Sequence, residues 1–213
     1  MKKCQPKLIL IDVDGTLVDS VPDLAYCVDE MMIQLGMPTR GESRVRHWVG
    51  NGVPRLVERA LTGDLDLKPS REVFDTAYPI FLDLYAENSA IRSSLYDGVK
   101  EGLDYLQSKN YLLGCVTNKA EQFTHPLLKS LNIYDYFKIV ISGDTLKKKK
   151  RDFSPLFHGA SFYNIYTRVC HMLGDSVSGK RAARGAVLDI MCITYGYSHD
   201  KNSVSYTYLR ARE

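Results

Sequence analysis

The sequence predicts an α/β fold, a Rossmann-like doubly wound parallel sheet with an all-helical unit inserted after its first strand. In the last 120 residues or so, short apolar runs typical of buried strands alternate with helical stripes. Residues 20–88, in contrast, carry helical periodicity and almost no strand signal. We therefore expect the sheet domain to comprise residues 1–17 and 95–213, and the helical domain to comprise residues 18–94.

The first predicted strand spans residues 7–11, an apolar and β-prone run that stops at Asp12. The helical block follows, with three apolar stripes whose members recur at spacings of three and four residues. The stripes are Leu24, Val28, Met31 and Leu35; Val53, Leu56, Val57, Ala60 and Leu61; and Val73, Phe74, Ala77, Phe81 and Leu84. Pro79 falls inside the third stripe, where it is expected to start or kink a helix.

After a turn at Tyr96-Asp97-Gly98, strands and helices alternate. Helices are predicted at residues 99–106, 123–131 and 180–186. Strands are predicted at residues 111–116, 138–141, 168–173 and 188–194. The residues after Tyr197 are polar and rich in tyrosine, and their pattern predicts no element.

Composition and charge exclude several classes of protein. Hydrophobic residues make up 45% of the 213 positions and charged residues 25%, which is ordinary for a globular chain. The net charge of +3 depends on the five basic residues at positions 147–151, so a basic surface for nucleic acid is not expected. No apolar run is long enough to span a bilayer, and the run after Lys2 and Lys3 is too short for a signal peptide. We expect a cytoplasmic monomer or homodimer with no nucleic-acid or membrane partner.

The five cysteines are odd in number and show no Cys-x-x-Cys spacing. Such usage is typical of reduced, buried thiols in a cytosolic protein. We therefore do not expect a zinc site.

Several of the predicted strands end in a small polar cluster. In an open parallel sheet the carboxyl ends of the strands share one rim, and ligands bind there. Carboxylates, threonines and glycine turns gathered at such a rim, with Lys150 nearby, suit a hard cation bound alongside a phosphate. The clusters are Asp12-Val13-Asp14-Gly15-Thr16, Thr117-Asn118, Ser142-Gly143-Asp144 and Gly174-Asp175-Ser176.

The run Asp12-Val13-Asp14-Gly15-Thr16-Leu17-Val18-Asp19-Ser20 resembles the opening motif of the haloacid dehalogenase superfamily of phosphatases. Within that superfamily the chain resembles the bacterial phosphoglycolate phosphatases. The resemblance extends from about residue 7 to residue 197. It continues through Val49-Gly50-Asn51-Gly52-Val53, Val116-Thr117-Asn118-Lys119, Ser142-Gly143-Asp144-Thr145 and Met172-Leu173-Gly174-Asp175-Ser176.

The resemblance implies a phosphomonoester hydrolase that works through an aspartyl-phosphate. Asp12 would be the nucleophile, and Asp14 would protonate the leaving oxygen and then activate water. Thr117 would hold phosphoryl oxygens, and Lys150 would neutralise charge on the nucleophile and the phosphate. Mg²⁺ would be held by Asp12, the backbone carbonyl of Asp14, and Asp175. We expect the chain to turn just after Asp12, and Gly15 permits that turn.

The helical block would then act as a cap that closes over the rim and excludes water. The implied substrate is a small phosphorylated organic acid or sugar, with 2-phosphoglycolate foremost. Its carboxylate calls for a cation, for which Arg55 and Lys119 are both candidates. The other implied substrate contacts are Gly15, Thr16 and Asn118 at the rim, and Gly50, Asn51 and Gly52 in the cap.

Two positions depart from the family pattern. Arg151 stands where relatives usually have proline after the catalytic lysine, which leaves Lys149 as an alternative to Lys150. Gly179 stands where the last motif usually has a second aspartate that supports the metal. Because of these departures, one alternative is that the chain is a catalytically impaired relative that binds a ligand or partner without turnover. A sugar-phosphate phosphatase or phosphomutase of the same superfamily is the other alternative.

Overall fold

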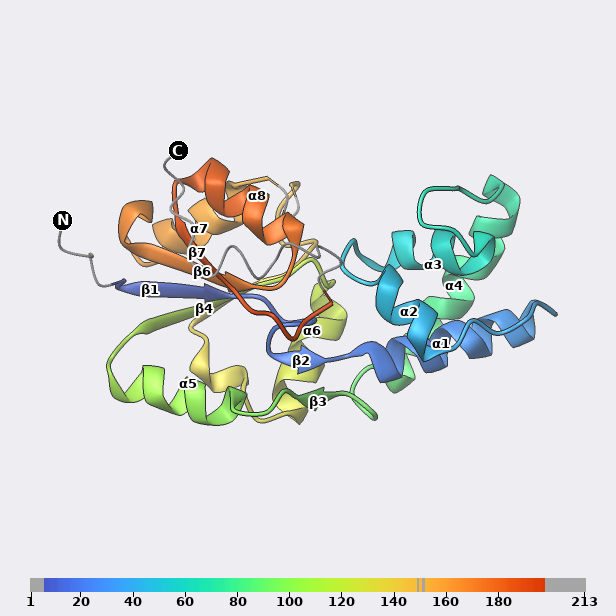
Figure 1. Ribbon diagram of the computed structural model, residues 1–213, viewed down its shortest axis with the longest axis horizontal. Helices are drawn as coiled ribbons and strands as arrows, with labels where there is room; N and C mark the ends of the chain where they lie inside the picture. The colour runs from blue at the N-terminus through green and yellow to red at the C-terminus, as the bar shows by residue number, and fades with distance from the viewer. Residues whose placement is uncertain (1–5, 149, 151, 198–213) are drawn as a thin grey trace.

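The computed structural model describes residues 6–148, 150 and 152–197. Its centre is a five-stranded sheet in the order β5-β4-β1-β6-β7, and every neighbouring pair is parallel (Figure 1). The sequence therefore predicted the α/β class and all five strands correctly, with ends shifted by no more than two residues. The strands are β1 (Leu8–Ile11), β4 (Leu112–Val116), β5 (Ile139–Ile141), β6 (Cys170–Gly174) and β7 (Asp189–Cys192).

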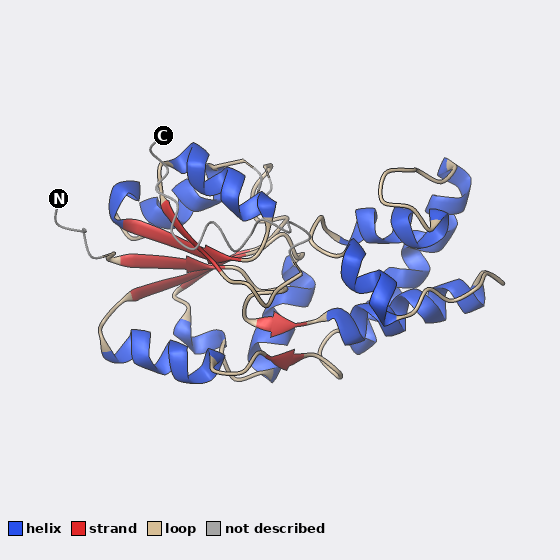
Figure 2. Cartoon of the chain, viewed as in Figure 1, coloured by secondary structure: helices blue, strands red, loops and turns tan. Residues whose placement is uncertain are grey.

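Helices cover both faces of this sheet, as Figure 2 shows. Alternate side chains of β1 serve the two faces: Leu8 and Leu10 pack against α7 and α8, whereas Ile9 and Ile11 pack against α5 and α6. Two short 3₁₀ helices, η1 (Tyr134–Tyr136) and η2 (Thr167–Val169), complete the connections. The α-helices that cover the sheet are α5 (Val99–Ser108), α6 (Glu121–Ser130), α7 (Ser154–Phe162) and α8 (Val177–Ala186).

Helix α7 was absent from the predicted elements. Its residues Phe157 and Phe162 are exposed, so apolar side chains lie on both its buried and its solvent side. That distribution conceals the period of 3.6 residues by which an amphipathic helix is recognised.

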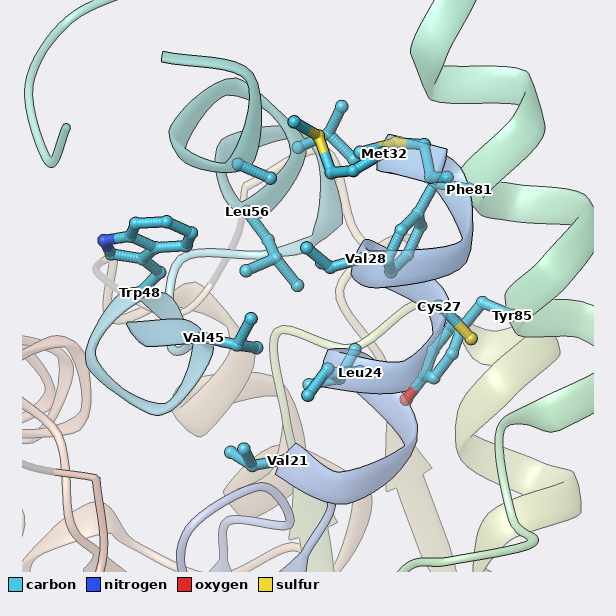
Figure 3. Close-up of a cluster of buried hydrophobic side chains, with 14 of the residues drawn as sticks. Val21, Leu24, Cys27, Val28, Met32, Val45, Trp48, Leu56, Phe81 and Tyr85 are labelled. Carbon is cyan, nitrogen blue, oxygen red and sulfur yellow. The ribbon is translucent and has the colours of Figure 1, made fainter. Parts of the chain in front are cut away.

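Four further helices form a separate layer beyond the carboxyl ends of the strands, toward which the arrowheads point in Figure 1. They pack around α1, whose Leu24, Val28 and Met31 are buried as the first stripe predicted (Figure 3). The second stripe lies in α3 and the third in α4, which continues through Pro79, although Val73 is exposed. The helices are α1 (Val21–Gln34), α2 (Glu42–Trp48), α3 (Val53–Thr62) and α4 (Arg71–Asn88).

The chain passes into and out of this helical layer through a short antiparallel pair, β2 (Val18–Asp19) and β3 (Ser94–Leu95). The buried carboxylate of Asp23, shortly after β2, links the two connecting segments of the chain. It accepts hydrogen bonds from the backbone N–H groups of Arg92 (2.7 Å) and Ser93 (2.9 Å), which precede β3. The hydroxyl of Ser93 also donates to it, at 2.5 Å. The assignment of residues 18–94 to a domain of their own stays a prediction. No helix in the described ranges has the length and apolar character needed to cross a membrane.

Replacing Asp23 is expected to destabilise the fold. In Asp23→Ala the two backbone N–H groups lose their acceptor inside the structure, and we expect the free energy of unfolding to fall by about 3 kcal/mol. Urea denaturation measures this. The control is Asp83→Ala on the exposed side of α4, which should shift the value by less than about 0.5 kcal/mol. Equal effects of the two substitutions would contradict the role given to Asp23.

Candidate active site

Asp12 lies directly after β1 and is only 5% exposed. Its N–H donates to the carbonyl of Leu173 at 3.0 Å, and its Oδ1 accepts the N–H of Val13 at 2.8 Å. Its Oδ2 forms an ion pair with Nζ of Lys150, a residue that is 2% exposed. The structure thus brings the predicted lysine to the predicted nucleophile, while Lys149 and Arg151 lie outside the described residues.

A second carboxylate, that of Asp175 after β6, shares this buried region. Burial, together with the negative charge of Asp12, raises its pKa to about 6. Burial likewise raises the pKa of Asp12, an effect that Lys150 opposes. Among the described residues, Lys150 is the one lysine that forms an ion pair with either carboxylate. The two carboxylates therefore form a region of negative charge that suits an additional cation.

Gly15 allows the loop after β1 to lie against Asp175. Its φ is +76°, which disfavours a residue with a side chain, and a Cβ atom there would lie 2.5 Å from Oδ2 of Asp175. The same Oδ2 accepts the N–H of Tyr197 at 2.7 Å. Gly15 therefore acts through close packing of the loop, and its backbone is the part that can face a ligand.

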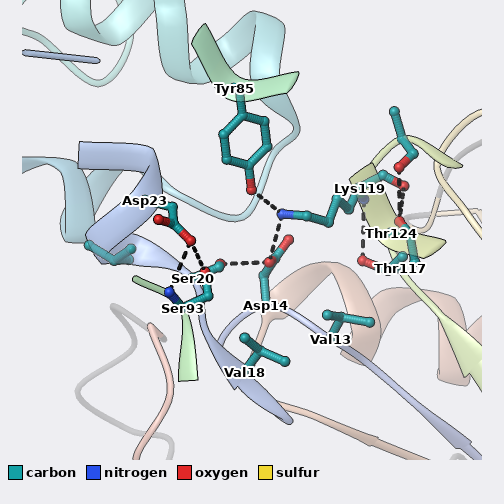
Figure 4. A network of polar contacts seen from close by, with 12 residues as sticks. Val13, Asp14, Val18, Ser20, Asp23, Tyr85, Ser93, Thr117, Lys119 and Thr124 are labelled. Atoms are coloured by element: carbon teal, nitrogen blue, oxygen red, sulfur yellow. Dashed lines mark hydrogen bonds and ion pairs between the residues drawn. The ribbon is translucent and has the colours of Figure 1, made fainter. Parts of the chain in front are cut away.

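Asp14 is only two residues from Asp12, but its carboxylate makes a different set of contacts (Figure 4). Its Oδ1 accepts a hydrogen bond from the hydroxyl of Ser20 at 2.6 Å and pairs with Nζ of Lys119 at 3.1 Å. The two aspartates therefore have different environments. The Asp12 carboxylate pairs with Lys150 at the end of the sheet. The Asp14 carboxylate lies where the sheet meets the helical layer.

Three buried side-chain oxygens at this rim, one from each of three loops, have no hydrogen-bond partner among the described residues. Buried Oγ1 of Thr16, Oδ1 of Asn118 and Oγ of Ser142 contact no donor or acceptor in the described part of the chain. Buried polar atoms are rarely left in this state, so the three oxygens are available to a ligand or to water.

Thr117 and Asn118 follow β4 and hold the loop that carries Lys119. Oγ1 of Thr117 accepts the N–H of Lys119 at 3.2 Å, and Nδ2 of Asn118 donates to the carbonyl of Lys150 at 3.2 Å. Asn118 does not cap the following helix, because α6 begins after Ala120, whose side chain cannot cap.

The two candidate cations for a substrate carboxylate have different surroundings. Arg55 pairs with Glu58 at 2.5 Å and donates to the carbonyl of Leu65 at 2.6 Å, so its guanidinium is occupied within the helical layer. Lys119 instead reaches the carboxylate of Asp14.

The predicted cap loop of Gly50, Asn51 and Gly52 joins α2 to α3 and is half-buried. Gly50 and Gly52 have φ values of +115° and +86°, so the loop depends on its glycines to turn. Its contact with a substrate stays a prediction.

The residues that sequence reasoning missed come from outside the strand ends. The hydroxyl of Tyr197 accepts the N–H of Ser20 at 2.8 Å and lies 2.8 Å from Oδ1 of Asp19, at the start of the helical layer. The hydroxyl of Tyr85, on α4, contacts Lys119. Neither tyrosine carries a local signal for such a role, since both read as apolar packing residues.

The donor set bears on which metal this site can hold. In the described ranges no three His, Cys, Asp or Glu side chains cluster as metal ligands. Asp12 and Asp175 provide two carboxylates, and the resemblance implies the backbone carbonyl of Asp14 as a further protein ligand. Hard oxygen donors in small number, completed by substrate and water, are typical of Mg²⁺.

The sequence and the fold of the chain are similar to those of known proteins. Residues 9–193 match the model of the haloacid dehalogenase-like hydrolase family. A phosphoglycolate phosphatase of Nitrosococcus oceani is 57% identical over 92% of this chain and 87% of its own length. One of Thiobacillus denitrificans is 40% identical over 92% of this chain and 86% of its own. A crystal structure described as a predicted phosphoglycolate phosphatase from Haemophilus somnus has a TM-score of 0.85 and 30% identity, over 94% of this chain and 90% of that one.

The raised pKa of Asp175 predicts how stability depends on pH when a chelator removes divalent cations. A carboxyl group with a raised pKa in the folded state contributes stability below pH 4 and loses it as the pH rises through about 6. The free energy of unfolding of the wild type, relative to Asp175→Asn, should therefore fall by about 2–3 kcal/mol between pH 4 and pH 7. Denaturant titrations of both proteins across this range measure the difference, and parallel curves would contradict the assignment.

Proposed function

The chain belongs to the haloacid dehalogenase-like hydrolase family, and from that premise we propose that its site hydrolyses 2-phosphoglycolate to glycolate and inorganic phosphate. The chain is a phosphatase, and its substrate is a small phosphorylated compound. The observation that carries the proposal is the buried ion pair between Asp12 and Lys150 at the end of β1, with Asp14 two residues further on.

Asp12 is the proposed nucleophile. One of its carboxylate oxygens attacks phosphorus and forms an aspartyl-phosphate, while the bond from phosphorus to the glycolate oxygen breaks. Asp14 gives its proton to that leaving oxygen and then takes a proton from the water that attacks the aspartyl-phosphate. Phosphate leaves and Asp12 is regenerated. Lys150 balances negative charge on the nucleophile and the phosphoryl group throughout.

The phosphoryl oxygens are proposed to meet the loops after β1 and β4. Thr117 supplies a hydroxyl and backbone amides there. The loops that carry Thr16 and Asn118 present the oxygens that have no partner among the described residues. The hydroxyl of Thr16 can donate to a phosphoryl oxygen, water would satisfy Oδ1 of Asn118, which only accepts, and the backbone of Gly15 completes the enclosure.

Phosphatases of this family are generally metal-dependent, and we propose Mg²⁺ for this chain. The carboxylates of Asp12 and Asp175 and the backbone carbonyl of Asp14 would hold it. Bound there, the cation would shield the repulsion between a carboxylate nucleophile and a phosphate dianion.

The helical layer, residues 18–94, is proposed to act as a cap over a core made of residues 1–17 and 95–213. Its position beyond the strand ends supports this, as does the passage of the chain through β2 and β3 only (Figure 1). Closure would bring Gly50, Asn51 and Gly52 toward the substrate and exclude water from the aspartyl-phosphate. A cytoplasmic location is supported by the buried thiols of Cys27, Cys115 and Cys170, which form no disulfide among the described residues.

The function is tested by phosphate release from 2-phosphoglycolate, with and without Mg²⁺. Turnover should require the cation, and Asp12→Asn should reduce it by a factor of about 10³ or more, since an amide cannot form the aspartyl-phosphate. The same assay on hexose phosphates distinguishes a sugar-phosphate phosphatase or phosphomutase. Turnover confined to a hexose phosphate would contradict the proposed substrate.

Gly179 provides a test of the metal site and of the alternative of a ligand-binding protein without turnover. It lies in the first turn of α8, where its N–H donates to Oγ of Ser176 at 3.3 Å, and a Cβ atom would have ordinary contacts of 3.7 and 3.8 Å. Gly179→Asp should fit there and lower the Mg²⁺ concentration for half-maximal activity by roughly 10-fold, because a carboxylate beside the site orients ligands and metal-bound water.

The matched control is Gly179→Ala. It should stabilise α8 by up to about 1 kcal/mol without changing the Mg²⁺ dependence. A wild type that is inactive and gains turnover only in Gly179→Asp would support the alternative. An unchanged Mg²⁺ dependence in both variants would show that residue 179 does not act on the metal.

A further inference from the structure

Lys119 is a buried cation that the proposed reaction does not yet use. Its side chain is 3% exposed, and its Nζ lies 3.1 Å from Oδ1 of Asp14 and 2.5 Å from the hydroxyl of Tyr85 (Figure 4). Burial works against its charge, but Asp14 and Tyr85 overcome this and raise its pKa, so the ammonium stays protonated. A buried, charged lysine is costly to maintain, and its charge calls for a function.

The position of Lys119 follows from the chemistry assigned to Asp14. Asp14 protonates the oxygen that leaves phosphorus, so the leaving group must lie against its carboxylate. In 2-phosphoglycolate a single CH₂ group separates that oxygen from the substrate carboxylate. A cation 3.1 Å from Asp14 is therefore within reach of the substrate carboxylate when the leaving oxygen contacts Asp14. An ammonium has three N–H donors. Among the described residues, Asp14 and Tyr85 accept hydrogen bonds from two of them.

Tyr85 holds this ammonium from the helical layer. Its ring is fully buried and packs against Phe123 of α6, with the ring centroids 4.7 Å apart. The contact joins α4 to the sheet domain and directs the tyrosine hydroxyl at Nζ of Lys119, as Figure 4 shows. The ammonium is thus oriented by groups from both parts of the protein.

We propose that Lys119 binds the carboxylate of the substrate and thereby selects phosphorylated carboxylic acids, and that Tyr85 is a positioning residue that orients its ammonium. This inference rests on the proposed phosphatase function and extends it to the origin of specificity. The preference for a carboxylate then depends on the helical layer being in place, because Tyr85 belongs to it.

The test compares 2-phosphoglycolate with ethyl phosphate, which has a methyl group in place of the carboxylate. In Lys119→Met, the ratio of kcat/KM for 2-phosphoglycolate to that for ethyl phosphate should fall by roughly 10- to 100-fold, the range expected for losing a charged hydrogen bond. Tyr85→Phe keeps the ring and removes only the hydroxyl, and its ratio should fall by about 3- to 10-fold through a higher KM for 2-phosphoglycolate. Lys119→Arg should retain part of the preference.

Tyr78→Phe, on the same helix, is the matched control and should leave the ratio unchanged. Thermal unfolding of each variant checks that it folds, and Tyr85→Phe keeps the test informative if Lys119→Met does not. A ratio that stays constant in Lys119→Met and Tyr85→Phe would overturn the inference, even if both rates fall, because Lys119 would then serve only Asp14 or the fold. A wild type that hydrolyses neither ester would instead refute the proposed function.

Discussion

The buried ion pair between Asp12 and Lys150 joins two loops that are far apart in the chain, one after β1 and one after β5. Neither charge is stable in this environment alone, because each has left water and depends on the other for compensation. The pair therefore fixes the direction of the Asp12 carboxylate at the centre of the rim. The charge of that carboxylate acts on Asp175, the loop of Gly15 packs against Asp175, and Nζ of Lys150 also donates to the carbonyl of Val116, the residue before Thr117.

Asp14 connects this rim to the helical layer. Its carboxylate contacts Ser20, which precedes α1, and Lys119, which α4 contacts through Tyr85. The group proposed to transfer the proton is thus held by residues whose placement depends on where the helices lie. Such an arrangement makes the position of the Asp14 carboxylate depend on the position of the helical layer.

The sequence predicted the structure best where a local pattern also determines the place of its residues in the fold. Strands buried on both faces appear as apolar runs, and the topology of a parallel sheet brings their carboxyl ends together, so the rim could be predicted from Asp12, Thr117 and Asp175. Resemblance to a known motif added the roles, which no spacing rule supplies. Helix α7 was missed because its apolar residues lie on two sides. Tyr85 and Tyr197 were missed because only packing between distant elements brings their hydroxyl groups to the site.

The proposed chemistry requires that Asp12 attack phosphorus and carry the phosphoryl group. Rapid acid quenching of the wild type during turnover of 2-phosphoglycolate with Mg²⁺, followed by mass spectrometry of the peptides, tests this directly. We predict a phosphoryl adduct on the peptide that contains Asp12, removed by hydroxylamine. Turnover with the adduct on another residue and none on that peptide would contradict this role of Asp12.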